Sequence, residues 1–286
     1  MHADETVVEV RRDGRPAGAE SRMWVYRSGE LEPNPIILYE YQKTRKKEHA
    51  RGFLKDFSGI CVTDGYQVYH SIADEREDLT IAGCWSHARR GFADVVKAAG
   101  KKDGNIRESV AYKSLQFIQT MSRYEEKFAK LEPTDRLEAR IHHVFPLVDA
   151  FFAYLKSKEG SIAPKSAARK ALSYCLNQEA FLRVFLTDGH VPMTNNAAER
   201  SIRPFTVGRN NWYQIDTVSG AKASAIAYSI AETAKANRLK PYEYFRYLLE
   251  ELPKHGELED LSYVEELLPW SGKLPKCCYQ KKASEN

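Results

Sequence analysis

The pattern of apolar residues changes part-way along the chain, and this change limits the folds that the sequence can form. In the first hundred residues, short β-branched runs alternate with stretches whose apolar residues recur at helical spacing. Most of the sequence between Trp85 and Asp188 has helical spacing alone. We therefore expect an α/β domain that is interrupted by a large all-helical insertion.

Three strands are expected at the start of the chain. Residues 6–10 are β-branched and alternating, and the turn-forming residues 12–16 lead to a second strand over 23–26. These two strands are expected to form a hairpin. A third strand is expected over 36–41, followed by a helix over 46–57.

A short, continuous apolar run over 59–63 is typical of a strand that is buried on both faces. It ends at Asp64, which we therefore expect at the carboxyl end of a strand. A short helix over 66–72, an apolar strand over 79–84 and a helix over 87–98 complete the order βββαβαβα. Three antiparallel strands followed by βαβ units match the ribonuclease H-like architecture, in which helices flank a mixed sheet.

The remainder of the chain is predicted to be mainly helical. Glu199 lies in the first turn of a helix that begins at Ala197 and that Pro204 is expected to interrupt. The tail after Leu268 is expected to be weakly ordered. The other helices are predicted over 106–130, 136–156 with a bend at Pro146, 165–177, 179–186, 221–236 and 241–254.

Four segments follow from this pattern. The first part of the core is expected over 1–98, and the helical insertion over 99–190. The second part of the core, with Glu199, is expected over 191–238. A helical extension and tail over 239–286 complete the chain.

The bulk composition excludes several classes of protein. Hydrophobic residues at 43% and charged residues at 29% are typical of soluble domains, and no apolar run approaches the roughly 20 residues that a membrane span requires. The first five residues resemble neither a signal nor a transit peptide, so the cytoplasm is the expected compartment. The five cysteines form no C-x-x-C pair and are expected to be reduced. The surplus of 43 Lys and Arg over 39 Asp and Glu is too small to indicate nucleic-acid binding by itself.

Three acidic residues are candidates for a metal site. Asp4 begins the first expected strand and Asp64 follows the fourth, so that adjacent strands of a sheet can bring them together. Neighbouring carboxylates stay ionised only if cations neutralise them, and their oxygen ligands suit Mg²⁺ or Mn²⁺. Glu199 offers a third ligand. Two such ions about 3.5 to 4 Å apart activate the attacking hydroxyl and stabilise the leaving oxygen in phosphodiester displacement.

Each of these acids also has a purely structural explanation. An Asp between a strand and a Gly is usually a turn residue, and a Glu in a first helical turn complements the helix dipole. Asp4 also has acidic neighbours in Glu5 and Glu9, although strand alternation places Asp4 and Glu5 on opposite faces. The residue pattern alone does not choose among them.

Several short segments are distinctive in combination. They are HADET at 2–6, TDGYQVY at 63–69, GCWSHARR at 83–90, NNAAERSIRP at 195–204, GRNNW at 208–212, YSIAETAKAN at 228–237 and LLPW at 267–270. Together, and in this order, they resemble the insertion sequence 66 family of transposases. The resemblance covers nearly the whole chain.

The resemblance implies a ribonuclease H-like catalytic core of the DDE type, named for its three acidic residues. Asp4, Asp64 and Glu199 stand at the family's acidic positions, where they would hold two Mg²⁺ or Mn²⁺ ions. Such enzymes nick and join double-stranded DNA at element ends and target sites without a covalent protein intermediate. A homo-oligomer is expected, and companion proteins of the element are further candidate partners. Family members usually carry a long amino-terminal region, and this region is expected to be missing here.

Basic residues near the acids are candidates for DNA contacts. Arg200, Arg203 and Arg209 lie close to Glu199 in the sequence, and Arg suits bidentate phosphate contacts that position DNA. A second group follows the strand over 79–84 and consists of His87, Arg89 and Arg90, for which a partly exposed basic turn is the alternative. Trp85 and Trp212 are candidates for stacking on a base, but core packing is favoured.

Two other functions stay open at this point. An inactive remnant that acts only as a DNA-binding or partner-binding module would carry the same motifs, although the presence of all three acids favours catalysis. A metal-free hydrolase with paired carboxylates, such as a glycosidase, would need sugar-stacking aromatic residues around the acids. Basic residues cluster near Glu199 instead.

Overall fold

The computed structural model describes residues 1–100, 105–255 and 262–281, and the chain divides into two compact units. The first unit contains Met1–Arg45 together with Ala197–Asn286. The second unit contains Lys46–Asn196. Each unit has a hydrophobic core of its own.

The first unit is built on a mixed sheet. β1 (His2–Arg12) pairs antiparallel with β2 (Glu20–Arg27), which pairs antiparallel with β3 (Ile37–Gln42). β6 (Gln214–Thr217) runs parallel to β1. The strands β1, β2 and β3 confirm the three strands expected at the start of the chain.

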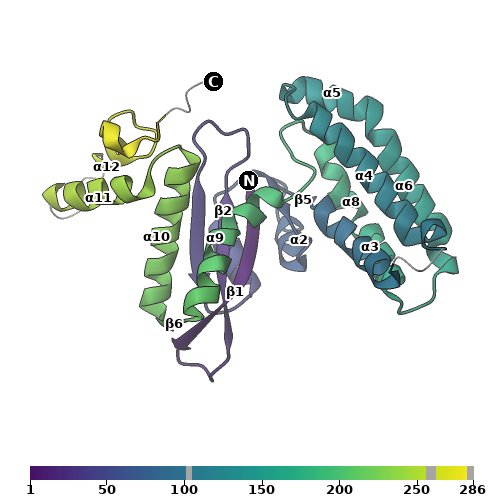
Figure 1. The fold of residues 1–286 in the computed structure, drawn as a ribbon, viewed down its shortest axis with the longest axis horizontal. Coiled ribbons are helices and arrows are strands. Elements are labelled where there is room, and N and C mark those ends of the chain that lie inside the picture. The colour runs from purple at the N-terminus through teal and green to yellow at the C-terminus, as the bar shows by residue number, and fades with distance from the viewer. Residues whose placement is uncertain (101–104, 256–261, 282–286) are drawn as a thin grey trace. The chain divides into compact units, whose positions relative to one another are not determined.

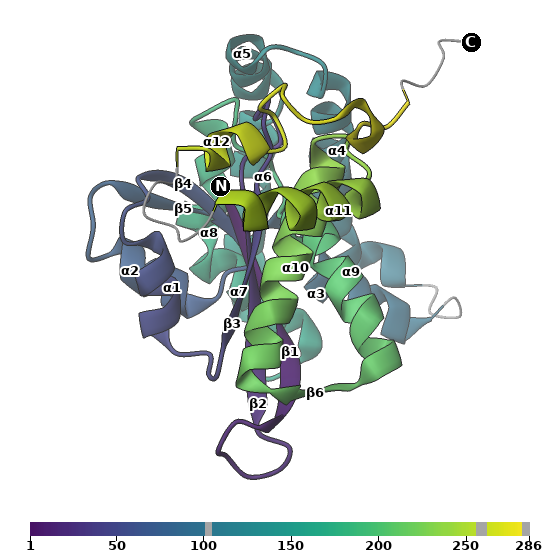
Figure 2. The same ribbon diagram turned by 90° about the vertical axis from the view of Figure 1, so that its left-hand side faces the viewer.

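The strand register places Asp4 on the face of this sheet that the helices cover. Asp4 lies opposite Val25, and Val25 lies opposite Tyr39. Paired residues of neighbouring strands point to the same face, so the three side chains share one side of the sheet. Val25 and Tyr39 are buried in a cluster with Phe205 of α9 (Asn196–Trp212). Figure 2 shows α9 and α10 (Val218–Ala236) alongside these strands.

The C-terminal part of the first unit forms a small cluster of its own. It contains α11 (Pro241–Glu251), α12 (Val264–Leu267) and short 3-10 turns at Leu252–His255 and Lys276–Cys278 (Figure 1). Leu274 and Cys278 are buried in this cluster, and the Lys240 amide donates to the Cys278 carbonyl at 2.7 Å. The expectation of a weakly ordered tail is therefore wrong for the described residues up to 281, whereas 282–286 lie outside them.

The second unit begins with a βαβ arrangement. After α1 (Lys47–Leu54), the strands β4 (Gly59–Thr63) and β5 (Leu79–Gly83) form a parallel pair that α2 (Gln67–Ala73) connects. The helix α3 (Trp85–Ala99) follows β5 directly. These elements confirm the order predicted from the sequence.

Helices occupy most of the rest of the second unit (Figure 1), and we refer to those between residues 106 and 186 as the helical insertion, after the prediction from the sequence. Its core contains Phe151 and Phe152, which pack around Trp85 of α3. The helices are α4 (Val110–Phe128), α5 (Pro133–His143), α6 (Phe145–Lys158), α7 (Ala167–Asn177) and α8 (Glu179–Arg183), with 3-10 turns at Ile106–Glu108, Glu159–Ser161 and Val184–Leu186.

Two prolines act differently from what the sequence suggested. The predicted bent helix over 136–156 is two helices, and Pro146 lies in the first turn of α6, where its missing N–H leaves no helical bond unmade. Pro204 was expected to interrupt a helix, yet α9 continues through it to Trp212. A proline inside a helix costs roughly 3 kcal/mol, and the buried side chains of Ile202 and Phe205 on either side hold the helix against the sheet.

The strand β6 was not predicted. Asp216 lies in this strand, and its carboxylate forms an ion pair with Arg12 of β1. Four residues with mixed polarity carry no clear period, so only their pairing with β1 reveals the strand.

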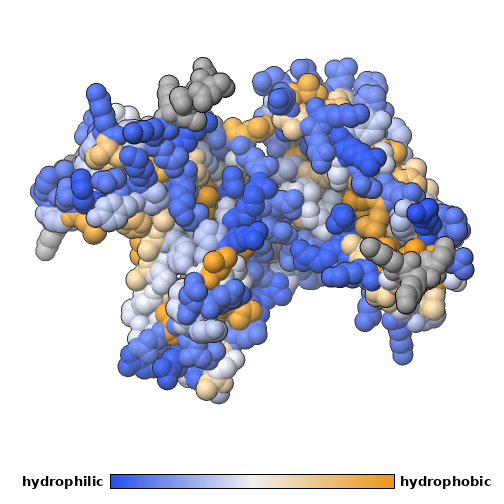
Figure 3. Space-filling view, viewed as in Figure 1, coloured by the Kyte–Doolittle hydropathy of each residue, from blue (hydrophilic) through white to orange (hydrophobic). Residues whose placement is uncertain are grey.

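The hydropathy of the surface and the state of the cysteines can be compared with what the composition predicted. The face shown in Figure 3 is mostly hydrophilic, and apolar side chains reach it in small patches. No helix in the described part of the chain has both the length and the hydropathy to cross a membrane. All five cysteines are free, as expected.

Candidate functional site

Asp64 lies directly after β4, as predicted, in a tightly defined turn. Its Oδ1 accepts a hydrogen bond from the Tyr66 amide at 2.9 Å. Gly65 between them has a φ of 94°, a conformation that favours glycine. The side chain of Asp64 is half-buried, and it forms no ion pair with any Lys or Arg that the structure describes. A carboxylate in this setting is available to a cation from outside the chain.

The segment that leads into α9 is fastened beside the end of β5. The Trp85 amide donates to the Met193 carbonyl at 3.1 Å, and the Asn195 amide donates to Cys84 Sγ at 3.1 Å. Ser86 Oγ donates to Asn196 Oδ1 at 2.9 Å. Because β5 is the parallel neighbour of β4, these contacts hold residues 193–196 of the second unit at the end of the strand pair where Asp64 lies.

Within the first unit, the amino-terminal end of α9 is held against the sheet near Asp4. Arg27 Nη1 donates to the Ala197 carbonyl and to Ser201 Oγ, each at 3.3 Å. The Tyr39 hydroxyl donates to the Ser201 carbonyl. Tyr39 is paired with Val25 and Val25 with Asp4 across neighbouring strands, so the three residues lie side by side in the sheet. The turn of α9 that Tyr39 contacts therefore crosses the sheet beside this set of paired residues.

The other end of α9 is held on β1 by Arg209. Its Nη1 donates to Thr6 Oγ1 at 3.0 Å and to the Val7 carbonyl. Glu199 is half-buried in the first turn of α9. The helix that carries Glu199 is therefore anchored to the sheet near both of its ends, to β2 and β3 at its start and to β1 through Arg209.

The structure distinguishes Asp4 from its neighbour Glu5. The Glu5 side chain is only 4% exposed and forms an ion pair with Arg45. It points to the opposite face from Asp4 because the two residues are adjacent in a strand. Asp4 is half-buried, and its Oδ1 accepts a hydrogen bond from the Glu5 amide at 2.8 Å. The pairing with Arg45 explains Glu5 structurally and leaves Asp4 as the acid on the side of α9.

The three predicted acids divide between the two units. Asp4 and Glu199 lie in the first unit and Asp64 lies in the second. No group of three or more His, Cys, Asp or Glu side chains among the described residues is placed to hold a metal ion. The meeting of the three carboxylates therefore stays a prediction.

The basic candidates on α9 have different environments. Arg203 is exposed and forms no ion pair within the described part of the chain. Arg200 is exposed and forms an ion pair with Glu30. Arg209 is half-buried and anchors α9 to β1, which gives it a structural role that the sequence did not suggest.

The basic candidates on α3 lie in its first two turns. His87 is half-buried, and its Nε2 lies 3.5 Å from Arg90 Nη1. Arg89 and Arg90 are exposed. These side chains are placed to meet a ligand at the surface of the second unit, and their contact with DNA stays a prediction.

The two tryptophans serve the cores. Trp85 is fully buried, and its Nε1 donates to the Leu182 carbonyl at 2.8 Å. Trp212 is half-buried and packs edge-on against Phe205 with ring centroids 5.4 Å apart. Core packing, which the sequence favoured, is confirmed for Trp85.

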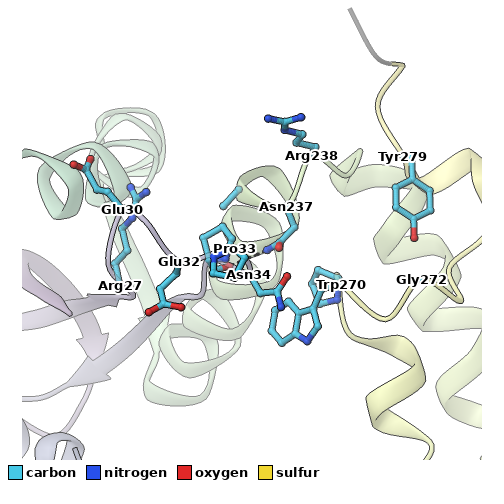
Figure 4. A pocket seen from close by; sticks show the side chains of 13 residues that line it. Arg27, Glu30, Glu32, Pro33, Asn34, Asn237, Arg238, Trp270, Gly272 and Tyr279 are labelled. Atoms are coloured by element: carbon cyan, nitrogen blue, oxygen red, sulfur yellow. Dashed lines mark hydrogen bonds between the residues drawn. The ribbon is translucent and has the colours of Figure 1, made fainter. Parts of the chain in front are cut away.

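The first unit also contains a pocket of about 650 Å³ between the β2–β3 loop, the end of α10 and the C-terminal segment (Figure 4). Trp270 lies in its wall. The basic Arg27 and Arg238 are matched by the acidic Glu30 and Glu32, so the lining carries no net charge. Such a lining does not concentrate phosphate groups, and we do not assign the pocket to DNA.

Two residues near the acids were not predicted from the sequence. Arg27 is one of them, and burial lowers its pKa below the ordinary value. Tyr174 of α7 is the other, and its hydroxyl donates to the main-chain carbonyl of Asp64 at 2.9 Å. No local signal identifies Tyr174, because it lies 110 residues from Asp64 in the chain.

Comparison with known proteins decides the family. A family model described as "Transposase IS66 family" matches residues 1–223, and a second, described as "IS66 C-terminal element", matches residues 229–270. The chain belongs to the IS66 family of transposases. The resemblance that the sequence motifs carried is thereby confirmed. The IS66 transposase match includes Asp4, Asp64 and Glu199, and the C-terminal element begins within α10.

Relatives of this IS66 chain include longer proteins from Sinorhizobium fredii (strain NBRC 101917 / NGR234). The chain is 27% identical to "Uncharacterized protein y4qI" over 284 residues, which are 96% of this chain and 51% of that protein. It is 28% identical to "Uncharacterized protein y4hP" over 286 residues, which are 96% of this chain and 50% of that protein. The chain thus spans about half the length of these relatives. No solved structure matches it.

Proposed function

We propose that this chain is the catalytic part of a transposase that cuts and joins DNA at the ends of an insertion element. Asp4, Asp64 and Glu199 are the proposed ligands of two Mg²⁺ or Mn²⁺ ions. The observation that carries the proposal is the environment of the Asp64 carboxylate, in a chain that belongs to the IS66 family. Asp64 is a half-buried carboxylate at a strand end, with no ion pair among the described residues.

The donor set fits hard divalent cations. Carboxylate oxygens are the ligands that Mg²⁺ and Mn²⁺ prefer. The Tyr66 amide holds Oδ1 of Asp64 and so fixes the carboxylate, while Oδ2 accepts no hydrogen bond from a described residue. Bound cations would also relieve the repulsion that three neighbouring carboxylates would otherwise feel.

A ribonuclease H-like core is part of the same proposal. The antiparallel order β3-β2-β1 is followed in the chain by the parallel unit β4–α2–β5, which is the succession that this architecture requires. In that architecture β4 would lie beside β1, and Asp4 and Asp64 would be neighbours. The helices α4 to α8 would then form an insertion before the helix that carries Glu199.

The chain's own residues hold and orient the reacting groups. The ions, when bound, would supply activation of the attacking hydroxyl and stabilisation of the leaving oxygen. The turn at Gly65 fixes Asp64, and the anchoring of α9 on β1 fixes Glu199. The exposed guanidiniums of Arg89 and Arg203 are the best placed to contact DNA phosphates, since neither is engaged in an ion pair in the described residues.

A strand-nicking assay tests the proposal. The substrate is a supercoiled plasmid that carries the ends of the element encoding the chain, with Mg²⁺, Mn²⁺ or a chelator. We expect nicking that depends on the metal and that falls at least about 100-fold in Asp64→Asn. Asp74→Asn, an exposed acid at the end of α2, is the matched control and should nick like the unaltered chain. Equal nicking by Asp64→Asn and the unaltered chain would refute the mechanism and leave a DNA-binding or partner-binding module.

A further inference from the structure

Three glycines of the second unit, two after or at the end of its strands and one in α3, lie in close contact with the helical insertion. A Cβ added at Gly83, at the end of β5, would lie 3.2 Å from the Leu182 amide nitrogen. A Cβ at Gly91 of α3 would lie 3.0 Å from the Cβ of Ala171 on α7. A Cβ at Gly65, after β4, would lie 2.8 Å from the Tyr174 hydroxyl. The insertion is therefore packed directly on the edge of the strand pair from which Asp64 projects.

The contact at Gly65 also fixes the main chain of Asp64. The Tyr174 hydroxyl donates a hydrogen bond to the Asp64 carbonyl at 2.9 Å. Gln178 also packs closely on this turn, because a Cβ added at Gly65 would lie 3.3 Å from its Oε1. A phenol keeps its proton at physiological pH, so the Tyr174 hydroxyl is a donor there.

Asp64 is thus held on both sides of its Cα. The Tyr66 amide holds the side chain through Oδ1, and Tyr174 holds the carbonyl. A carbonyl that loses its donor lets the peptide between Asp64 and Gly65 rotate, and Gly65 offers little resistance because it tolerates many φ angles. The direction of the carboxylate depends on that peptide.

From this geometry we infer that Tyr174 is a positioning residue for Asp64, and that the insertion is a structural part of the proposed metal site. The inference rests on the proposed function. Groups that orient a metal ligand typically change metal affinity or activity by about 10- to 100-fold when they are removed. The alternative is that Tyr174 only packs between the insertion and β4, in which case its hydroxyl would not affect metal dependence.

Tyr174→Phe tests the inference because it removes the hydroxyl and keeps the ring. We expect the Mn²⁺ concentration for half-maximal nicking of the plasmid to rise about 10- to 100-fold, with the KM for DNA unchanged. The matched control is Tyr154→Phe, another half-buried tyrosine of the insertion, whose ring packs on Phe117 at 5.9 Å. It should leave the Mn²⁺ midpoint unchanged.

Amide hydrogen exchange gives a second readout that needs neither DNA nor metal. We expect the Tyr66 amide, which donates to Asp64 Oδ1, to exchange faster in Tyr174→Phe than in Tyr154→Phe. If the unaltered chain nicks no DNA with any divalent cation, the proposed function fails. Exchange at the Tyr66 amide then still tests whether the Tyr174 hydroxyl holds Asp64 in place. If the unaltered chain is active and Tyr174→Phe keeps its Mn²⁺ midpoint, the inference is overturned, whatever the exchange shows.

Discussion

The guanidinium of Arg140 on α5 is buried in the helical insertion and makes a two-point ion pair with Glu125 of α4. Nε lies 2.9 Å from Oε1, and Nη2 lies 2.6 Å from Oε2. Nη1 donates to the carbonyls of Phe185, Asp188 and Val191 at 2.7, 3.0 and 2.9 Å. One side chain therefore joins two helices to the segment that follows α8.

Replacing Arg140 by Met should destabilise the second unit strongly. The change leaves Glu125 with an unpaired charge and three carbonyls without the Arg140 donor, two of them in buried contacts. Breaking a buried ion pair costs about 3 to 5 kcal/mol. Urea unfolding followed by circular dichroism measures the loss. The control Asp149→Asn breaks the more exposed Arg183–Asp149 pair and should cost no more than about 1 kcal/mol. Equal losses in the two variants would contradict the role assigned to Arg140.

Gly65→Ala should lower both stability and nicking. Its φ of 94° strains an alanine, and the new Cβ would lie 2.8 Å from the Tyr174 hydroxyl. Strain of this kind costs about 1 to 3 kcal/mol, measured as a change in the free energy of unfolding. Gly52→Ala in α1 meets no atom within 4 Å and should be neutral or stabilise by up to about 1 kcal/mol. A Gly65→Ala variant as stable and active as Gly52→Ala would show that the turn is not constrained.

His70 should make the stability of the second unit depend on pH. Its ring is buried and stacked on Phe181 with centroids 3.7 Å apart, and burial lowers its pKa although Asp74 and Asp64 act in the opposite direction. The folded chain thus binds this proton less readily than the unfolded chain does. This contribution is present above the ordinary pKa of about 6.5 and decreases as the pH falls from there toward the lower folded pKa.

Unfolding at pH 7.5 and pH 5.5 measures this dependence. In His70→Phe the ring stack on Phe181 is kept and the titrating group is removed, so the loss of stability between the two pH values should be smaller than in the unaltered chain. An identical loss in both chains would mean that other groups account for the pH dependence.

Asp4 and Glu5 should separate catalysis from stability. Asp4→Asn should reduce nicking at least about 100-fold, because it removes a proposed metal ligand. Glu5→Gln should keep nicking but lower the free energy of unfolding by about 1 to 3 kcal/mol, because it breaks the pair with Arg45. Paired nicking and unfolding measurements on the two variants check this. The reverse result would assign the metal site to Glu5.

Much of the site could be anticipated from local sequence. The apolar run of β4 correctly placed Asp64 at a strand end, and alternation in β1 correctly separated Asp4 from Glu5. The engagement of Glu5 by Arg45 could not be anticipated, because the two residues lie 40 positions apart. The anchoring role of Arg209 was missed for the same reason, since Thr6 lies 203 positions away.

Local sequence was enough to predict the succession of strands and helices, because the periods of 2.0 and 3.6 residues involve side chains that are near one another in the chain. Three features became known only from the folded chain: α9 passes through Pro204, residues 214–217 form a strand, and the tail packs on α11. Each of these outcomes depends on burial against residues distant in the chain, which outweighs local preference. The hydrogen bond from Tyr174 to Asp64 belongs to the same class, because folding alone brings α7 to the end of β4.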